Sequence, residues 1–184
     1  MASKSERTTD NIRRNAETHS EEKRHHAIFQ HSAVSLWEED ITRLRAAIRS
    51  LQADGAFSLP DYLDRHPEFL REAARLIEVT DVNDATLRLY GAPRKEDLLG
   101  PLDNTLDLDD PPTLSGMREE ILVIAEGKSR FKHESTAVTP GGKRLNIIVE
   151  AHIPGPADSY PRMLVSILDI TEQRRAEEAL RESE

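Results

Sequence analysis

The sequence predicts an α+β fold in which one antiparallel sheet is flanked by short helices. Two observations carry this prediction. Apolar residues recur at helical spacing over much of residues 41–127, whereas the last third of the chain alternates apolar and polar residues as strands do. At 184 residues the chain is long enough for one such domain but short for two. The expected strands are the five segments 33–40, 77–81, 130–138, 144–153 and 162–170.

The N-terminal residues 1–23 are expected to form a polar mobile tail, because they hold too few large apolar residues to offset the entropy cost of ordering. The domain itself is expected over residues 24–170. It begins with a short helix around Ile28 that leads into the first strand. Trp37 on that strand is the one tryptophan of the chain, and we expect it to anchor the core or its rim.

A helical insertion is expected between the first two strands, over about residues 41–76. Gly55 would cap the first of its helices. Ser58 lies three residues before Asp61, a spacing typical of a capping box, and Pro67 begins the next helix. The apolar stripe of the first helix consists of Ile41, Leu44, Ile48 and Leu51.

Three further helices are expected between the second and third strands, including a short one over 94–99 that Gly100 and Pro101 stop. Asn83 is a strong N-cap for a short helix that ends at Gly91. A longer helix over 113–126 should end at Gly127. The acidic segment before this helix is expected to be a solvated loop, because no base lies near it in the sequence. Its members are Asp103, Asp107, Asp109 and Asp110.

The register of the hairpin between 130–138 and 144–153 depends on its loop. An odd-numbered loop around Pro140 to Gly142 places the apolar face of the second strand on the same side as Phe131. An even-numbered turn would set those apolar residues opposite Lys132 and its charged neighbours. We therefore expect the odd loop, which directs His133 toward the core and His152 away from it.

The chain ends in a helix expected over residues 171–184. Asp169 and Glu172 resemble an acidic capping box at its start. Its apolar stripe follows coiled-coil spacing but is poor in large residues, so the helix is marginal alone in water. We expect its order to come from the preceding strand, from a second copy, or from residues beyond Glu184.

Four groups of residues from Asn83 onward form a recognisable set. They are Asn83, Leu87, Tyr90 and Gly91, then Glu96, Leu98 and Gly100, then Gly141 and Gly142, and finally Asp169, Ile170, Thr171 and Glu172 running into Arg175, Ala176, Glu177, Glu178, Ala179 and Leu180. With these motifs, residues 85–184 resemble the PAS family of sensory domains. The resemblance implies an antiparallel sheet cradled by short helices around an internal pocket. In sensor histidine kinases and cyclic-di-GMP enzymes, the acidic-Ile-Thr motif ends the last PAS strand and begins a signalling helix.

The resemblance also bears on cofactors. The flavin photoreceptor branch needs a reactive cysteine and this chain has none, so a flavin photoadduct is excluded. Haem-binding members often use a histidine on the long helix before the third strand, and residues 113–126 contain none, which disfavours haem. The insertion over 41–76 departs from the tight hairpin usual in the family and is similar to that of one subgroup.

The candidate pocket residues are Trp37, Tyr90, His133 and Ser135. A neutral imidazole facing a sheet-lined cavity could bind a ligand or change its charge near neutral pH, although a core histidine with satisfied hydrogen bonds is the plainer interpretation of His133. The other histidines form no pattern of metal ligands, so no metal site is predicted. No phosphate-binding loop or catalytic constellation is present either, and we predict a regulatory domain and not an enzyme.

Charge and composition limit the partners. A net charge of −9 argues against nucleic acid, which is bound through clustered Lys and Arg. The absence of cysteine is compatible with a cytoplasmic location, and no segment is apolar over the roughly 20 residues of a membrane span. The predicted partners are a second copy of the chain, a downstream output domain and a small-molecule ligand.

Three functions remain open from the sequence. The first is a sensory module whose input reaches the C-terminal helix through a relay of Asp169, Ile170, Thr171 and Glu172. The second is a ligand-free dimerisation module in which side chains fill the pocket. The third is a small enzyme or lipid carrier built on a similar curved sheet.

Overall fold

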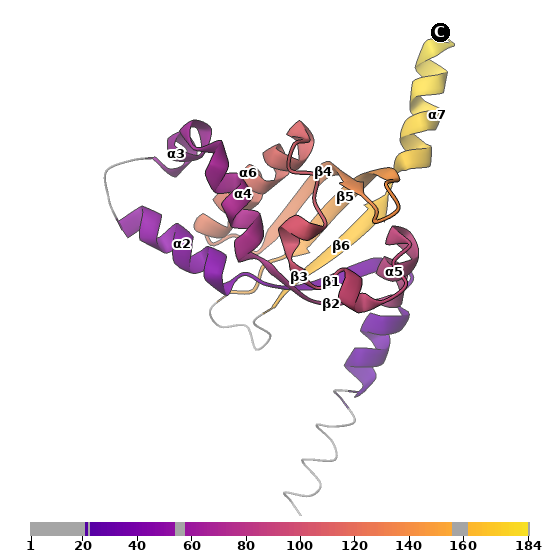
Figure 1. Ribbon diagram of the computed structural model, residues 1–184, viewed down its shortest axis with the longest axis horizontal. Helices are drawn as coiled ribbons and strands as arrows, with labels where there is room; N and C mark the ends of the chain where they lie inside the picture. Colours follow the sequence, from indigo (N-terminus) through magenta and orange to yellow (C-terminus); the bar gives the residue numbers. More distant parts are fainter. Residues whose placement is uncertain (1–20, 22, 54–57, 156–161, 184) are drawn as a thin grey trace, which may run out of the picture.

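The computed structural model describes residues 21, 23–53, 58–155 and 162–183. Its centre is one antiparallel sheet with the strand order β3-β2-β1-β6-β5-β4 (Figure 1). The expected α+β class and antiparallel sheet are confirmed, with the two-residue strand β3 added to the five strands predicted. The strands are β1 (Ser35–Asp40), β2 (Glu78–Val82), β3 (Gly100–Pro101), β4 (Arg130–Val138), β5 (Arg144–His152) and β6 (Met163–Asp169).

Helices fill the long connections between these strands. Residues 23–31 are helical before β1, and two 3₁₀ turns, η1 (Lys95–Asp97) and η2 (Leu102–Asn104), flank β3. Among the described residues, no helix has the length and apolar character needed to cross a membrane. The α-helices are α2 (Thr42–Ala53), α3 (Leu59–Arg65), α4 (Pro67–Leu76), α5 (Asp84–Tyr90), α6 (Pro111–Ala125) and α7 (Thr171–Glu182).

The core lies between the sheet and helix α6. This helix packs on β4, and α2 and α4 pack in turn on α6. The helical stripes predicted from the sequence point into this layer, as the complete burial of Leu44 and Ile48 on α2 shows. On β1 the burial alternates residue by residue, so that Ser35, Trp37 and Glu39 share the inner face. Trp37 is only 1% exposed, which confirms it as a core anchor.

The β4–β5 hairpin has the odd-numbered loop predicted from the sequence. Val138 pairs with Arg144, so residues 139–143 form the loop. The amide of Thr139 donates to the Lys143 carbonyl at 2.9 Å, and Gly142 takes a positive φ of 80° that suits glycine. His133 therefore pairs with Val149 on the inner face, while His152 is exposed.

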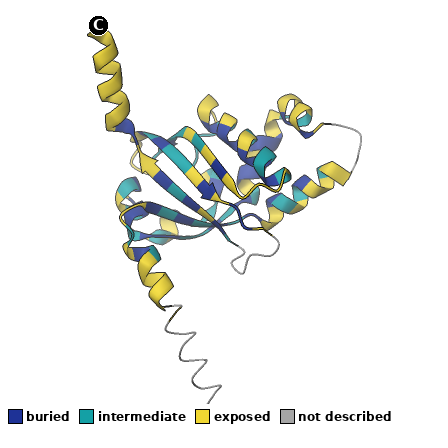
Figure 2. Ribbon diagram, turned by 180° about the vertical axis from the view of Figure 1, so that it is seen from behind, coloured by how far each residue is buried: buried dark blue, intermediate teal, exposed yellow. Residues whose placement is uncertain are grey.

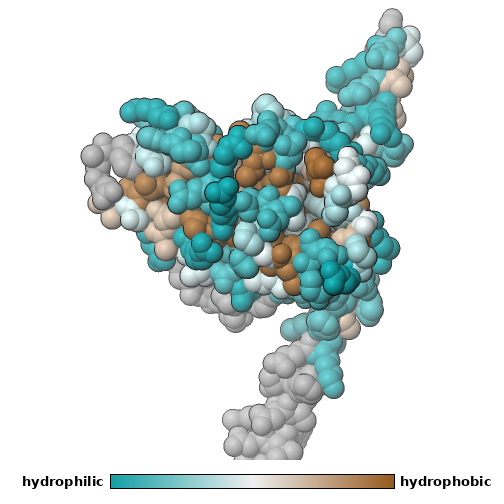
Figure 3. Space-filling model, in the orientation of Figure 1, coloured by the Kyte–Doolittle hydropathy of each residue, from teal (hydrophilic) through white to brown (hydrophobic). Residues whose placement is uncertain are grey.

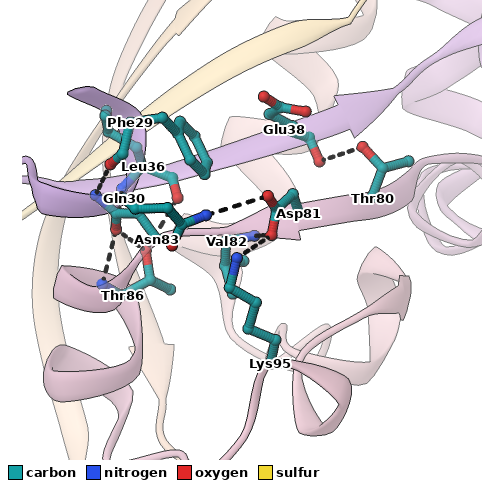
Figure 4. A network of polar contacts seen from close by, with 10 residues as sticks. All are labelled: Phe29, Gln30, Leu36, Glu38, Thr80, Asp81, Val82, Asn83, Thr86 and Lys95. Atoms are coloured by element: carbon teal, nitrogen blue, oxygen red, sulfur yellow. Dashed lines mark hydrogen bonds and ion pairs between the residues drawn. The ribbon is translucent and has the colours of Figure 1, made fainter. Parts of the chain in front are cut away.

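Asn83 joins three segments that are far apart in the sequence (Figure 4). Its Oδ1 accepts from the backbone amides of Thr86 and Leu36, both at 3.0 Å. Its Nδ2 donates to the carbonyls of Phe29 at 3.0 Å and Val34 at 2.8 Å. The N-cap role predicted for Asn83 is confirmed, and the same side chain also attaches the N-terminal helix and β1 to α5.

Two predicted capping boxes are wrong in detail. Ser58 occupies the N-cap position of α3, but its side chain makes no capping hydrogen bond, and Pro60 in the first turn lacks the amide that such a cap could use. At α7 the N-cap is Ile170 and not Asp169. The predicted cap at Gly55 lies outside the described residues, as does the tail up to residue 20.

The two terminal helices leave the body of the domain on different sides. Helix α7 extends away from the sheet beside the β4–β5 hairpin, whereas the helix of residues 23–31 leaves below α5 (Figure 1). Seen from behind, both are exposed along most of their length (Figure 2). The visible side of α7 is largely hydrophilic (Figure 3). Leu180 of this helix is 65% exposed. Few contacts within the described residues therefore hold α7 beyond its first turn.

Candidate functional site

A cavity of about 70 Å³ lies between the inner face of the sheet and α6. A cavity of this volume has room for about five water molecules. Strands β1, β4, β5 and β6 line one side of the cavity, and α5, α6 and the segment after η2 line the other. The four residues proposed from the sequence, Trp37, Tyr90, His133 and Ser135, all line it. The fold thus brings these residues together from β1, α5 and β4.

Trp37 and Tyr90 form an aromatic wall of the cavity. Their ring centroids are 5.1 Å apart with an interplanar angle of 70°, which is an edge-to-face contact. The indole Nε1 of Trp37 donates to Ser35 Oγ at 3.1 Å, so the ring is held in place. Burial, together with the nearby carboxyl of Glu39, raises the pKa of Tyr90, and its phenol stays neutral.

His133 connects β4 to the first turns of α6. Its Nε2 lies 3.1 Å from the Pro112 carbonyl oxygen, and its Nδ1 lies 3.1 Å from Glu119 Oε2. A carbonyl oxygen can only accept, so Nε2 carries a proton. Both ring nitrogens are occupied, which matches the structural interpretation of this histidine more closely than the ligand-binding one.

Gly116 on α6 makes room for the His133 ring. A Cβ at position 116 would lie 2.7 Å from His133 Cδ2 and 3.1 Å from Nε2, closer than carbon atoms pack. The φ of Gly116 is not positive, so space and not backbone conformation requires glycine here. The sequence shows only a glycine inside a helix, a position that normally costs about 1 kcal/mol relative to alanine.

We expect Gly116→Ala to displace His133 and to lower the free energy of unfolding by about 1 kcal/mol, because the clash outweighs the gain in helix propensity. In a His133→Ala background the same change should raise stability, since the clash is gone. Chemical denaturation of the four proteins of this cycle measures both effects. Additive effects of the two substitutions would contradict the contact.

The prediction of a solvated acidic loop is wrong for Asp110. It is 8% exposed and caps α6 by accepting from the Thr113 amide at 3.2 Å. Thr136 Oγ1 donates to the same carboxylate at 2.6 Å, and Arg144 forms an ion pair with it. Partial burial acts to raise the pKa of Asp110, but the hydrogen bonds and Arg144 outweigh it and hold this pKa below its ordinary value. Asp110 therefore fixes the start of α6 to β4 and β5.

Ser135 borders this cluster. Its Oγ lies 3.4 Å from Thr113 Oγ1, and either hydroxyl can donate. Because Thr113 also reaches Asp110 at 3.1 Å, the hydroxyls form a chain from the cavity to the N-terminus of α6. Ser135 can therefore present a donor or an acceptor to a molecule in the cavity.

Glu39 and Glu120 are the two carboxylic acids that line the cavity, and the sequence interpretation missed both. They come from β1 and α6, and are 4% and 7% exposed. Burial raises the pKa of Glu120 to about 7. Burial, reinforced by the charge of Glu120, raises the pKa of Glu39 well above its ordinary value. A signal was available: Glu39 shares the strand face of Trp37, and Glu120 lies on the helical face of Met117 and Ile124.

The start of α7 is attached to β5. The amide of Ile170 donates to the Asn146 carbonyl at 2.8 Å, and Thr171 Oγ1 accepts from the Asn146 amide at 2.9 Å. Asp169 Oδ1 accepts from the Thr171 amide at 2.9 Å, which replaces the expected capping box. Ile170 and Thr171 are 6% and 5% exposed, whereas Glu172 points outward and pairs with Arg175 at 2.9 Å.

Each strand that holds α7 also contributes to the cavity. Asn146 precedes the cavity residue Ile147, and the cavity residue Ile167 lies two positions before Asp169. On β4, Glu134 forms an ion pair with Arg174 of α7 and is flanked by His133 and Ser135. Along these strands, the residues that line the cavity therefore lie within one or two positions of the residues that contact the first turn of α7.

No family model matches the sequence, and no curated protein matches it. Comparison with solved structures is informative. The PAS domain of a protein from Colwellia psychrerythraea superposes with a TM-score of 0.53 at 16% identity, covering 82% of this chain and 97% of that one. The chain has a PAS fold.

A second structure with this PAS fold, an RNA-binding Light-Oxygen-Voltage receptor, superposes with a TM-score of 0.55 at 15% identity. The match covers 85% of this chain and 35% of the receptor. In the present PAS fold the insertion α2–α4 extends the core beyond α6, and none of its described residues lines the cavity. Nor do the described residues include a group of three His, Asp or Glu side chains placed to hold a metal ion.

Proposed function

We propose that this chain is a sensory domain of a signalling protein, in which occupancy of the cavity changes the position of α7. The observation that carries the proposal is the sharing of strands: β4, β5 and β6 line the cavity and also hold the first turn of α7. The PAS fold supports it, since sensory domains use this fold. The role is regulatory, and the output domain downstream of α7 would be that of a histidine kinase or a cyclic-di-GMP enzyme.

Small energies are enough for such a relay. A differential affinity of about 1.4 kcal/mol changes a two-state ratio tenfold. Helix α7 is 12 residues long, which is marginal for an isolated helix in water. Its hold on the sheet through Asn146 and Glu134 therefore decides how ordered it is. Asp169, Ile170 and Thr171 take part in attaching α7 to the sheet, whereas Glu172 interacts only within the helix.

We expect Thr171→Ala to uncouple α7 from the cavity while the domain stays folded. The loss of the Thr171 hydroxyl leaves the Asn146 amide without its acceptor, at a cost of about 1 kcal/mol. Hydrogen exchange of the first turn of α7 should become about fivefold faster, and the signalling output should lose its response to stimulus.

Thr80→Ala is the matched control, because it removes the hydrogen bond from Thr80 Oγ1 to the Glu38 carbonyl at 3.1 Å on β2, away from α7. This variant should keep both exchange and regulation. An output that responds normally in Thr171→Ala would contradict the relay.

A ligand-free dimerisation module is the second candidate, and the exposed apolar residues favour it. Ile28 on the N-terminal helix, Leu168 on β6 and Leu180 on α7 are 62%, 54% and 65% exposed. A second copy of the chain could cover them, and a homodimer is part of our proposal in either case. The same regulation assay separates the candidates: a response in protein that native mass spectrometry shows to be free of small molecules supports dimerisation alone.

A further inference from the structure

Among the residues that the structure describes, no cationic side chain lines the cavity beside its two buried carboxyl groups. Glu120 Oε1 is buried without any hydrogen-bond partner in the described part of the chain. Buried polar groups are almost always paired, because leaving one unpaired costs about 1–3 kcal/mol. An unpaired carboxyl oxygen on a residue that lines a cavity therefore points to a partner that the described part of the chain does not supply.

The surroundings define the chemistry of that partner. Within the described residues, no Lys or Arg lines the cavity, and both nitrogens of His133 are taken up by Pro112 and Glu119. The remaining walls consist of the aromatic rings of Trp37, Tyr90 and Phe131, several aliphatic side chains, and the hydroxyl-bearing residues Thr105, Thr113, Ser135 and Thr136. The cavity thus offers two acidic groups and aromatic faces, and aromatic faces attract cations.

We propose that the cavity binds a small organic cation, with an ammonium or guanidinium head at the carboxyl groups of Glu39 and Glu120 and an apolar part against Trp37 and Phe131. This inference rests on the proposed function and names its ligand class. The volume of about 70 Å³ limits the buried part of the ligand to a few non-hydrogen atoms.

Cation binding at Glu39 and Glu120 is coupled to the protons of their carboxyl groups. Burial raises the pKa of Glu120 to about 7 and that of Glu39 well above its ordinary value, so a cation that enters while a carboxyl group is protonated must displace its proton. Binding should therefore release protons and strengthen as pH rises toward 8. The other titratable groups that face the pair are Tyr90 on α5 and His133 on β4.

The test uses four probes of similar size and different charge: n-butylammonium, butan-1-ol, butyramide and butyrate. Each is titrated calorimetrically into the 184-residue chain at pH 8 and pH 5.5. We expect n-butylammonium to bind at least about tenfold more tightly than the other three, because its hydrogen bonds to carboxylates are charge-assisted. Repeating the titration in buffers of different ionisation enthalpy reports the released protons.

Three variants assign the effect to residues. Glu120→Gln and Glu39→Gln keep the shape of the side chain, and each should weaken n-butylammonium binding about tenfold. Glu72→Gln removes an exposed carboxylate from α4 and should leave binding unchanged. Equal binding of butyramide or butan-1-ol would show that the acids act as neutral donors and would overturn the proposal. Affinity unchanged in both cavity variants, or absent for all four probes, would overturn it too.

Hydrogen exchange of α7 keeps this proposal distinct from the sensory function. If n-butylammonium binds as expected and α7 does not respond, the cation site stands and the relay fails. If butyrate or a neutral probe binds and changes α7 while n-butylammonium does neither, the relay stands and the cation site fails.

Discussion

Replacing Asn83 with alanine is expected to lower the free energy of unfolding by about 4 kcal/mol, the largest effect of any single substitution considered. Asn83 is completely buried, and its amide group satisfies two backbone amides and two backbone carbonyls. Alanine would leave all four without their partner. Thermal unfolding should shift by about 10 °C, and the helix of residues 23–31 should lose protection from hydrogen exchange.

Two further variants show which role of Asn83 dominates. Aspartate is as good an N-cap as asparagine, so Asn83→Asp would be nearly neutral if capping α5 were the only role. In the structure, however, the second oxygen of the aspartate would face the carbonyls of Phe29 and Val34. We therefore expect a loss close to that of alanine. Asn104→Ala, at an exposed position, should change stability by less than about 0.5 kcal/mol. A stable Asn83→Asp protein would contradict the joining role.

The free energy of unfolding is expected to fall as pH rises from about 4.5 to about 7, by about 3 kcal/mol. Burial raises the pKa of Glu120 from its ordinary 4.5 to about 7, and raises that of Glu39 as well. Within this window the folded state keeps a proton that the unfolded state has released. The stabilisation is therefore complete below pH 4.5 and is lost as pH rises through the folded-state pKa.

Urea unfolding across pH 4.5 to 8 measures this dependence. The glutamine in Glu120→Gln cannot ionise, so this variant should show a smaller slope, with Glu39 still contributing, and should be more stable than the natural chain at pH 8. Glu72→Gln should leave the slope as it is. Asp110, whose pKa is lowered, contributes outside this window, since its stabilisation is lost only as pH falls below about 4. A flat profile in the natural chain would show that the two carboxyl groups are not held protonated.

Local patterns in the sequence were sufficient to predict most of the fold. The loop of residues 139–143 has an odd length because only that register places Leu145 and Ile147 on the same side as Phe131. Asn83 was identified as a cap from its position before a short apolar pattern. The helices of the insertion followed from the spacing of residues such as Leu44 and Ile48. Each of these features is set by residues within one element or one hairpin.

Local sequence patterns predicted only part of the candidate site. Trp37, Tyr90, His133 and Ser135 do line one cavity, but their selection drew on the family resemblance. Glu39 and Glu120 were missed because charged residues are normally assigned to solvent, and each would be solvated in an isolated strand or helix. Asp110 was misplaced for the same reason, since Arg144 and Thr136 reach it only after β4 and β5 pack on α6.

The sequence by itself determined the alternation of strands and helices, the hairpin register and the cap at Asn83, because these depend on contacts between near neighbours in the chain. Only the tertiary structure decided which polar groups are buried together. The carboxyl groups of Glu39 and Glu120 are separated by 81 positions in the sequence and acquire their raised pKa from the shared loss of water between β1 and α6. Desolvation of this kind is a property of the packed layers, and no local pattern contains it.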